Sequence, residues 1–423
     1  TFMQHIESLA YSIKEWYVFE NTEQLLSQFQ VLKFENELIL LKGARKFSFE
    51  KITAQLIGQT HTTVLEVKLS ALTNNLNVYK NFIAKETGVI AMVKAFSYGS
   101  GSVEVASLLE KQHVSYLAVA YADEGVELRR AGIKTPIMVM NPDAVDFDRM
   151  LANNLEPEIY SLHILQQLIQ KINGKNVNVH IKLETGMNRL GFVEEIIEDL
   201  VLVLLQHPNI IVKTTFSHLA ASEDPQLDAF TKAQITQFEK LSGILISSLN
   251  YPIKKHILNS AGIVRFPEAH YDFVRLGIGL YGVDASDTIQ QKLIPIGKLK
   301  TRIAQIKHVP KGQSIGYSRK GIADKDLKIA ILAIGYADGY DRRFGNGKGE
   351  VFIAGQRAHI IGNICMDMCM ADITHIDNAQ EGEECEIYGK EISIINAAQN
   401  IGTIAYELLT RISARVKRLY YLD

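Results

Sequence analysis

Between residues 88 and 282, short runs of apolar and β-branched residues alternate with amphipathic stretches. The intervening segments, such as 102–112, 123–132 and 194–206, carry apolar residues at three- and four-residue spacing, which is typical of helices with one buried face. Strands that alternate with helices form parallel βα units, and eight units close into a (β/α)8 barrel. The eight expected strands are 89–95, 116–120, 136–141, 156–160, 179–184, 210–219, 256–260 and 273–278.

After residue 298 the pattern changes to short strands separated by glycine-containing turns, which predicts an all-β C-terminal domain. We therefore divide the chain into segments 1–60, 61–298 and 299–423, and the early strand 63–69 is free to pack onto the β domain. The first segment is too short for a robust core of its own. The clearest C-terminal strand regions are 300–317, 328–340, 350–362 and 381–389.

The composition of the chain argues against two classes of function, nucleic-acid binding and membrane binding. The chain has 423 residues, 47% of them apolar, with a formal charge of −2, which argues against a nucleic-acid-binding surface or attraction to anionic membranes. No apolar run reaches the roughly 18 residues of a membrane helix, and the N-terminus lacks a signal-peptide pattern. Three cysteines are an odd number for a disulfide framework. We expect a cytoplasmic protein that binds small molecules.

Cys365 and Cys369 invite interpretation as metal ligands, but no second cysteine pair or histidine cluster accompanies them. Buried thiols are the better interpretation, and we expect no metal site.

Lys94 ends the first expected barrel strand, the edge at which barrels build their active sites. In isolation such a lysine is usually a solvated strand end. Here Tyr98, Gly99 and Gly101 follow it in a tight loop suited to close approach by a bound group. Ser260 follows the seventh strand, where barrels commonly bind phosphate, although a lone turn serine would carry no function.

The segment MVKAFSYGSG (92–101) resembles the lysine motif of alanine racemases, the barrel-fold class of pyridoxal-phosphate enzymes. Further segments resemble other motifs of that family in the same order and spread the resemblance over about residues 62–420. These segments are KLETGMNRLGF (182–192), FSHLA (216–220), NSAG (259–262), FVRLGIGLYG (273–282), IGYS (315–318), IGYADGY (334–340) and ICMDMCM (364–370).

The resemblance implies roles for the residues of a pyridoxal 5'-phosphate site. Lys94 would bind the cofactor aldehyde covalently, and His218 would contact the ring. Arg275 would face the pyridine nitrogen and, being permanently charged, keep it unprotonated. The phosphate would be bound by the hydroxyls of Tyr98 and Ser260 and by the backbone N–H groups of Gly277 and Ile278.

The resemblance also implies a substrate site for alanine. Arg189 would bind the substrate carboxylate, and a carbamylated Lys182 would orient that arginine. Tyr336 and Met366 would lie at the entrance and at the carboxylate, Met366 acting through its backbone.

Racemisation needs a base on each face of the reacting carbon, because a single base would return the proton to its original side. Tyr317 is the candidate that would oppose Lys94. Tyrosine ordinarily has a pKa near ~10, so a positive or hydrogen-bonded environment is needed to make it a base. In the resembled family one subunit supplies this tyrosine to the other, which implies a homodimer.

The sequence departs from the family pattern in places. Phe96, Ser97 and Ser100 replace the residues that are common in the lysine motif, and Ala414 stands where we expect a phosphate-binding tyrosine. Outside the racemase match, LLKGARKFSFEKI (40–52) resembles the C-terminal end of a Mur-type ligase, which implies a remnant of a ligase–racemase fusion without a P-loop.

Two alternatives stay open at this stage. One is a non-catalytic pyridoxal-phosphate carrier, a class that lacks the β domain with Tyr317 and Met366. The other is a related decarboxylase or an amino-acid racemase of broader specificity, and the decarboxylase motifs are absent from the sequence.

Overall fold

The computed structural model describes residues 17–29 and 62–422, together with isolated positions between 32 and 56. The chain forms two compact units, Thr1–Thr62 and Thr63–Asp423. The first contains helix α2 (Thr22–Ser27), which begins after Asn21, whose side chain accepts a hydrogen bond from the Gln24 N–H at 2.9 Å. Apart from isolated positions, the ligase-like segment 40–52 lies outside the described residues.

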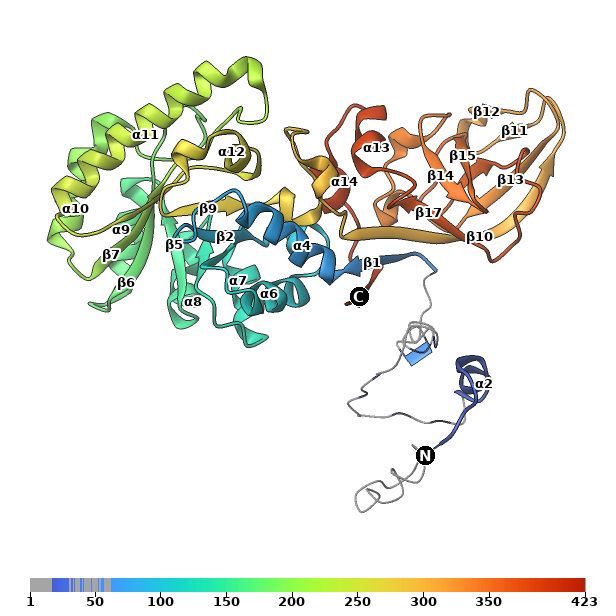
Figure 1. Ribbon diagram of the computed structural model, residues 1–423, viewed down its shortest axis with the longest axis horizontal. Helices are drawn as coiled ribbons and strands as arrows, with labels where there is room; N and C mark the ends of the chain where they lie inside the picture. Colours follow the sequence, from blue (N-terminus) through green and yellow to red (C-terminus); the bar gives the residue numbers. More distant parts are fainter. Residues whose placement is uncertain are drawn as a thin grey trace. The chain divides into compact units, whose positions relative to one another are not determined.

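The second unit contains a parallel barrel of eight strands (Figure 1). Its strands follow the order β8-β7-β6-β5-β4-β3-β2-β9. Backbone N–H groups of Asp272 and Arg275 then donate to the carbonyls of Lys255 and Leu258, at 3.2 and 3.0 Å, and so join β9 to the β8 end. Eight strands are present, as predicted: β2 (Gly88–Met92), β3 (Tyr116–Val119), β4 (Ile137–Val139), β5 (Leu155–Ile159), β6 (Val177–Lys182), β7 (Ile210–Phe216), β8 (Lys254–His256) and β9 (Phe273–Leu276). The bounds of β8 differ from the predicted 256–260, because the strand ends at His256 and Ser260 begins the next helix.

Amphipathic helices follow the strands and cover the outside of the barrel (Figure 1). In α9, Ile164, Leu165, Leu168 and Ile172 are buried at helical spacing. Ser161 caps its start by accepting from the Ile164 N–H. The helices of this region are α4 (Leu69–Lys80), α5 (Lys94–Tyr98), α6 (Ser102–Lys111), α7 (Ala122–Arg130), α8 (Phe147–Ala152), α9 (Leu162–Ile172), α10 (Ile197–Gln206), α11 (Asp228–Leu249) and α12 (Ser260–Arg265).

The C-terminal domain is built on a closed antiparallel sheet. Its long strand β10 (Gly297–Val309) pairs with β17 through its first part and with β13 through its second, across an irregularity between Ile303 and Gln305. The ring runs on from β13 through β16, β15 and β14 to β17, so these strands leave no unpaired edge. The strands are β13 (Leu327–Leu332), β14 (Glu350–Ile353), β15 (Gln356–Ile361), β16 (Cys369–Asp372) and β17 (Glu384–Tyr388).

Two further strands attach to this sheet. β1 (Val64–Lys68) precedes the barrel in sequence, yet it pairs antiparallel with β10 and parallel with β18 (Lys417–Tyr421). This domain also contains two helices that were not predicted, α13 (Ile394–Asn400) and α14 (Ala405–Thr410). Across the described residues, no helix is both long and apolar enough to cross a membrane.

Candidate active site

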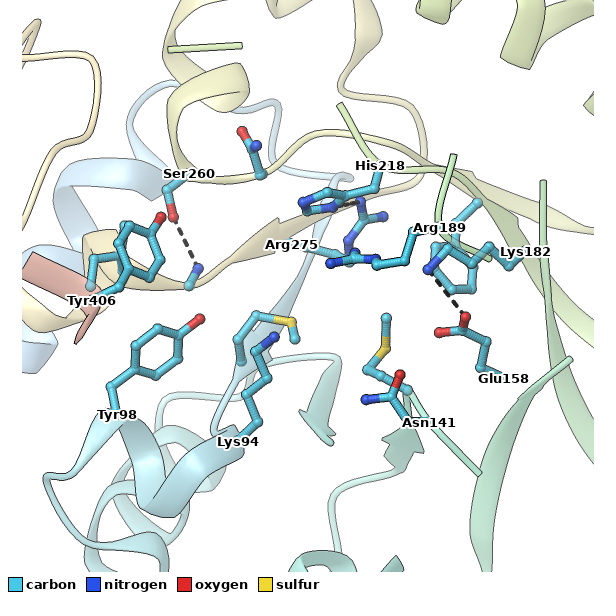
Figure 2. A pocket seen from close by; sticks show the side chains of 16 residues that line it. Lys94, Tyr98, Asn141, Glu158, Lys182, Arg189, His218, Ser260, Arg275 and Tyr406 are labelled. Atoms are coloured by element: carbon cyan, nitrogen blue, oxygen red, sulfur yellow. Dashed lines mark hydrogen bonds and ion pairs between the residues drawn. The ribbon is translucent and has the colours of Figure 1, made fainter. Parts of the chain in front are cut away.

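A cavity of ≈ 380 Å³ opens at the carboxyl ends of the barrel strands. Its size falls in the range of small-molecule sites. It brings together side chains from β2, β5, β6, β7 and β9 and from the loops that follow them (Figure 2). Among the residues predicted for the site, those that line it are Lys94, Tyr98, Lys182, Arg189, His218, Ser260, Arg275, Gly277 and Ile278.

The loop that presents Lys94 has an unusual backbone. The four residues after it have positive φ angles of 50–55°, a region that non-glycine residues rarely adopt. The Glu124 carboxylate holds this loop by accepting from the N–H groups of Ala95 and Ala120, both at 2.6 Å. Burial and then the Arg189 charge lower the pKa of Lys94. A lower pKa favours the neutral amine, which is the form that attacks a carbonyl carbon.

The three departures from the lysine motif lie outside the cavity lining. Ser97 and Ser100 are buried. The Arg418 guanidinium lies over the ring of Phe96, with its Cζ atom 5.2 Å from the ring centroid. These substitutions therefore alter the packing of the loop rather than the surface of the cavity.

Ser260 forms one end of the cavity. Its hydroxyl oxygen accepts from the backbone N–H groups of Gly277 at 3.0 Å and Gly279 at 3.3 Å. A Cβ at position 277 would lie 2.9 Å from the Tyr98 hydroxyl, so this approach requires glycine. Backbone N–H groups and hydroxyls gathered in this way are suited to a phosphate.

Arg275 crosses the floor of the cavity and is almost completely buried. Its Nη1 donates to His256 Nδ1 at 2.7 Å, and its Nη2 donates to the carbonyls of Ser217 and Ile257 at 2.6 and 2.8 Å. Burial lowers its pKa to about 10, which leaves the guanidinium charged at neutral pH. No described residue accepts from Nε, so that donor is available to a ligand.

The imidazole of His218 lines the cavity beside Arg275. Its Nδ1 lies 3.2 Å from Arg275 Nη2 and must accept, because arginine has no acceptor. Burial, followed by the Arg275 charge, holds the pKa of His218 well below its ordinary value. The imidazole is therefore neutral, with its proton on Nε2.

A chain of hydrogen bonds continues from Arg275 through the barrel interior. Because Arg275 donates to His256 Nδ1, the proton of His256 lies on Nε2 and is donated to the Thr214 hydroxyl at 3.0 Å. Thr214 then donates to His180 Nδ1 at 2.9 Å, and His180 Nε2 donates to Glu156 at 3.0 Å. Each proton position follows from the one before it, so the chain fixes the orientation of Arg275.

Lys182 and Arg189 lie together at the far side of the cavity (Figure 2). Lys182 Nζ lies 3.2 Å from Glu158 Oε1, and both side chains are buried. Sequence reasoning missed Glu158. The signal was available, because Glu156 and Glu158 are two residues apart in β5 and therefore point to the same face of the strand.

Tyr317, Tyr336 and Met366 do not line this cavity. They form a second cluster in the C-terminal domain, where the Asn363 side chain donates to the Tyr317 carbonyl at 3.0 Å and Tyr336 N–H donates to the Cys365 carbonyl at 3.1 Å. All three side chains are exposed, Tyr317 to 67%. Tyr317 lies between β11 (Ser314–Ile315) and β12 (Gly321–Ile322). Figure 1 shows these two strands at the end of the domain away from the barrel.

The expectation about position 414 needs correction. Ala414 is exposed and lies in the turn before β18, outside the cavity lining. The lining instead includes Tyr406, whose ring centroid lies 6.0 Å from that of Tyr98. Helix α14 reaches the lysine loop because Gly99 has no side chain: a Cβ there would lie 2.3 Å from the Leu409 carbonyl oxygen. Only packing between the two domains reveals this tyrosine.

Comparison with known families agrees with this geometry. Residues 67–285 match the model described as "Alanine racemase, N-terminal domain", and residues 296–420 match "Alanine racemase, C-terminal domain". The chain belongs to the alanine racemase family. The predicted family resemblance of the main part of the chain is thus confirmed, whereas neither match extends to residues 1–60.

Members of the family cover most of the chain. It is 37% identical to the alanine racemase of Methanococcus maripaludis over 374 residues, 85% of this chain and 99% of that protein. For the alanine racemase of Clostridium tetani the identity is 38% over 372 residues, 85% of this chain and 95% of the relative.

Solved structures of the family have the same fold. The alanine racemase of Clostridium difficile 630 matches with a TM-score of 0.81 and 35% identity, over 86% of this chain and 97% of that one. The Bartonella henselae alanine racemase with covalently bound pyridoxal phosphate matches with a TM-score of 0.78 and 27% identity, over 85% and 99% of the two chains.

Proposed function

We propose that this chain is an alanine racemase that uses pyridoxal 5'-phosphate to interconvert L- and D-alanine, and so supplies D-alanine for peptidoglycan. Beyond membership of the family, one observation supports the proposal most strongly. Lys94, Ser260 and Arg275 line the same cavity, at the edge of the barrel where active sites of this fold lie. Lys94 supplies an amine, Ser260 a phosphate-binding end and Arg275 a fixed charge.

The residues present fit the cofactor. Ser260, the N–H groups of Gly277 and Ile278, and the hydroxyls of Tyr98 and Tyr406 would hold the phosphate at one end of the cavity. The free Nε of Arg275 is the donor for the ring nitrogen. When bound, pyridoxal phosphate delocalises the electron pair that remains on the α-carbon after proton loss.

The chain's own residues then bind the substrate and move its proton. Arg189 binds the carboxylate of alanine, with the backbone of Met366 beside it and Tyr336 at the entrance. Lys94 Nζ takes up or returns the α-proton on the D-alanine side, and the Tyr317 hydroxyl does the same on the L-alanine side. Because Arg275 stays charged, it leaves the ring nitrogen unprotonated, which limits stabilisation of the carbanion and favours return of the proton to the same carbon.

Two copies of the chain are needed for this arrangement. The exposed cluster of Tyr317, Tyr336 and Met366 supports a homodimer in which each C-terminal domain completes the cavity of the partner subunit. A carrier that performs no chemistry would not require this second cluster.

We also propose that the protein is cytoplasmic and that residues 1–60 are the remnant of a ligase fused to the racemase. Three free cysteines support a cytoplasmic, reducing compartment. The resemblance of 40–52 to a ligase end supports a fusion remnant in residues 1–60.

A racemisation assay tests the function. The optical rotation of L-alanine is followed with and without added pyridoxal phosphate, and the assay is repeated with serine, lysine and glutamate. We expect loss of rotation for alanine only, dependent on the cofactor. Binding of the cofactor without loss of rotation would favour the carrier, and comparable rates with several amino acids would favour a racemase of broad specificity.

A further inference from the structure

The charge balance of the cavity is uneven. Its described lining contains the basic side chains of Lys94, Lys182, Arg189 and Arg275, and the acidic side chain among these residues is Glu158. The positive excess suits a phosphate and a substrate carboxylate, which makes the presence of a fixed carboxyl group unexpected.

Glu158 is completely buried at the end of β5. Its carboxyl oxygens have no aligned hydrogen-bond donor among the described residues, and Lys182 Nζ lies 3.2 Å from Oε1. Burial raises the pKa of Glu158 to about 7, although the Lys182 charge opposes that rise. A buried ion pair rarely adds net stability, because removing both charges from water is costly. The pair therefore calls for a functional explanation.

The chemical state of Lys182 offers a functional explanation for this pair. Carbamylation of this amine would attach a second anionic group beside Glu158, and two buried carboxylates at such a distance cannot both ionise readily. The Glu158 carboxyl group already places an acidic side chain beside Lys182, without any modification of the lysine.

We propose that Glu158 is a positioning residue that pairs with an unmodified Lys182, so that the substrate-carboxylate end of the cavity is assembled without carbon dioxide. This inference rests on the proposed function for the identity of that end, whereas the state of Lys182 can be measured without turnover.

Removal of Glu158 should expose the alternative chemistry. Burial lowers the pKa of Lys182 and the Glu158 charge opposes that effect, so loss of Glu158 favours the neutral amine. The lone pair of a neutral amine nitrogen attacks the carbon of CO2, a C–O π pair moves to oxygen, and the N–H proton passes to solvent. The product is a carbamate that restores a negative charge near the vacated position.

The experiment uses the cofactor-loaded protein equilibrated with ¹³C-bicarbonate and examined by ¹³C NMR and intact mass. For the native chain we expect no carbamate signal assignable to Lys182 and a KM for alanine that bicarbonate does not change. For Glu158→Ala we expect one carbamate per chain, absent from the double variant Glu158→Ala/Lys182→Ala, and a KM that changes with bicarbonate. Glu158→Gln, which keeps the side-chain volume, should also gain the carbamate and replaces Glu158→Ala if that variant does not fold.

Glu386→Gln is the matched control, because Glu386 is a buried acid paired with Lys298 at 3.1 Å outside the cavity. It should take up no CO2 at Lys182. A carbamate in the native chain that disappears in Lys182→Ala would overturn the proposal. So would a folded, cofactor-loaded Glu158 variant without carbamate. A chain that shows the expected carbamate pattern but racemises nothing would refute the proposed function instead.

Discussion

At the scale of single residues, Lys94 has the most distinctive surroundings. Its side chain is partly buried, burial lowers the pKa of its amine, and the Glu124 carboxylate fixes the loop that carries it. Lys94→Ala is expected to abolish the absorption band of the lysine-bound cofactor and nearly all turnover, because Lys182, the other lysine of the described lining, is paired with Glu158 at the far side of the cavity. Absorption spectra and the racemisation assay measure both effects. A borohydride-stable adduct between the Lys94→Ala chain and the cofactor would contradict the assignment.

The second proposed base allows a stereochemical test. Tyr317→Phe keeps the ring and removes the hydroxyl, so the cofactor spectrum should persist while racemisation falls by about 10²–10⁴-fold. Exchange of the α-proton with solvent deuterium should survive far better from D-alanine than from L-alanine. NMR of the two enantiomers measures this asymmetry, and equal residual exchange from both would argue against a division between two bases.

The hydrogen-bond chain behind Arg275 gives a third test. Thr214→Val keeps the shape of the side chain but leaves His256 Nε2–H and His180 Nδ1 without their shared partner. An unpaired buried polar group costs about 1–3 kcal/mol, so the free energy of unfolding should fall by that order. Thr214→Ser, which retains the hydroxyl, is the control. Chemical denaturation measures both variants, and equal stability of the valine and serine variants would contradict a structural contribution from this chain of hydrogen bonds.

At the scale of elements, α14 links the C-terminal domain to the lysine loop of the barrel. Tyr406→Phe should weaken cofactor binding by about tenfold, the equivalent of roughly 1.4 kcal/mol and of one hydrogen bond to a charged group. Release of the cofactor on dilution measures the affinity. Tyr160→Phe changes a tyrosine outside the cavity lining and should leave it unchanged. Unaltered affinity in Tyr406→Phe would remove this residue from the phosphate end.

The elements also show which features the sequence could predict. The strands and helices of the barrel could be predicted from the spacing of apolar residues, because each segment carries its own pattern of buried and exposed positions. Tyr406 could not be found in this way, since its place depends on the approach of α14 to Gly99. The spacing of Glu156 and Glu158 gave a local signal, but the partner of Glu158 depends on β6, which places Lys182 against it. Residues that depend on contacts between distant segments are those that local pattern reading misses.

At the scale of the whole molecule, the proposed site is divided between two surfaces. Lys94 lies in the barrel cavity, whereas Tyr317 is exposed on the C-terminal domain outside that cavity. One isolated chain therefore does not bring the two proposed bases together in the described cavity, and a head-to-tail pair of chains would do so at two sites.

Subunit complementation tests this account most directly. Purified Lys94→Ala and Tyr317→Ala chains, each inactive alone, are mixed under conditions of proven subunit exchange, and racemisation of L-alanine is followed with cofactor present. In a mixed dimer one of the two sites contains both native residues, so activity should return toward about half of the native value per mixed dimer. No recovery despite proven exchange would contradict the shared site.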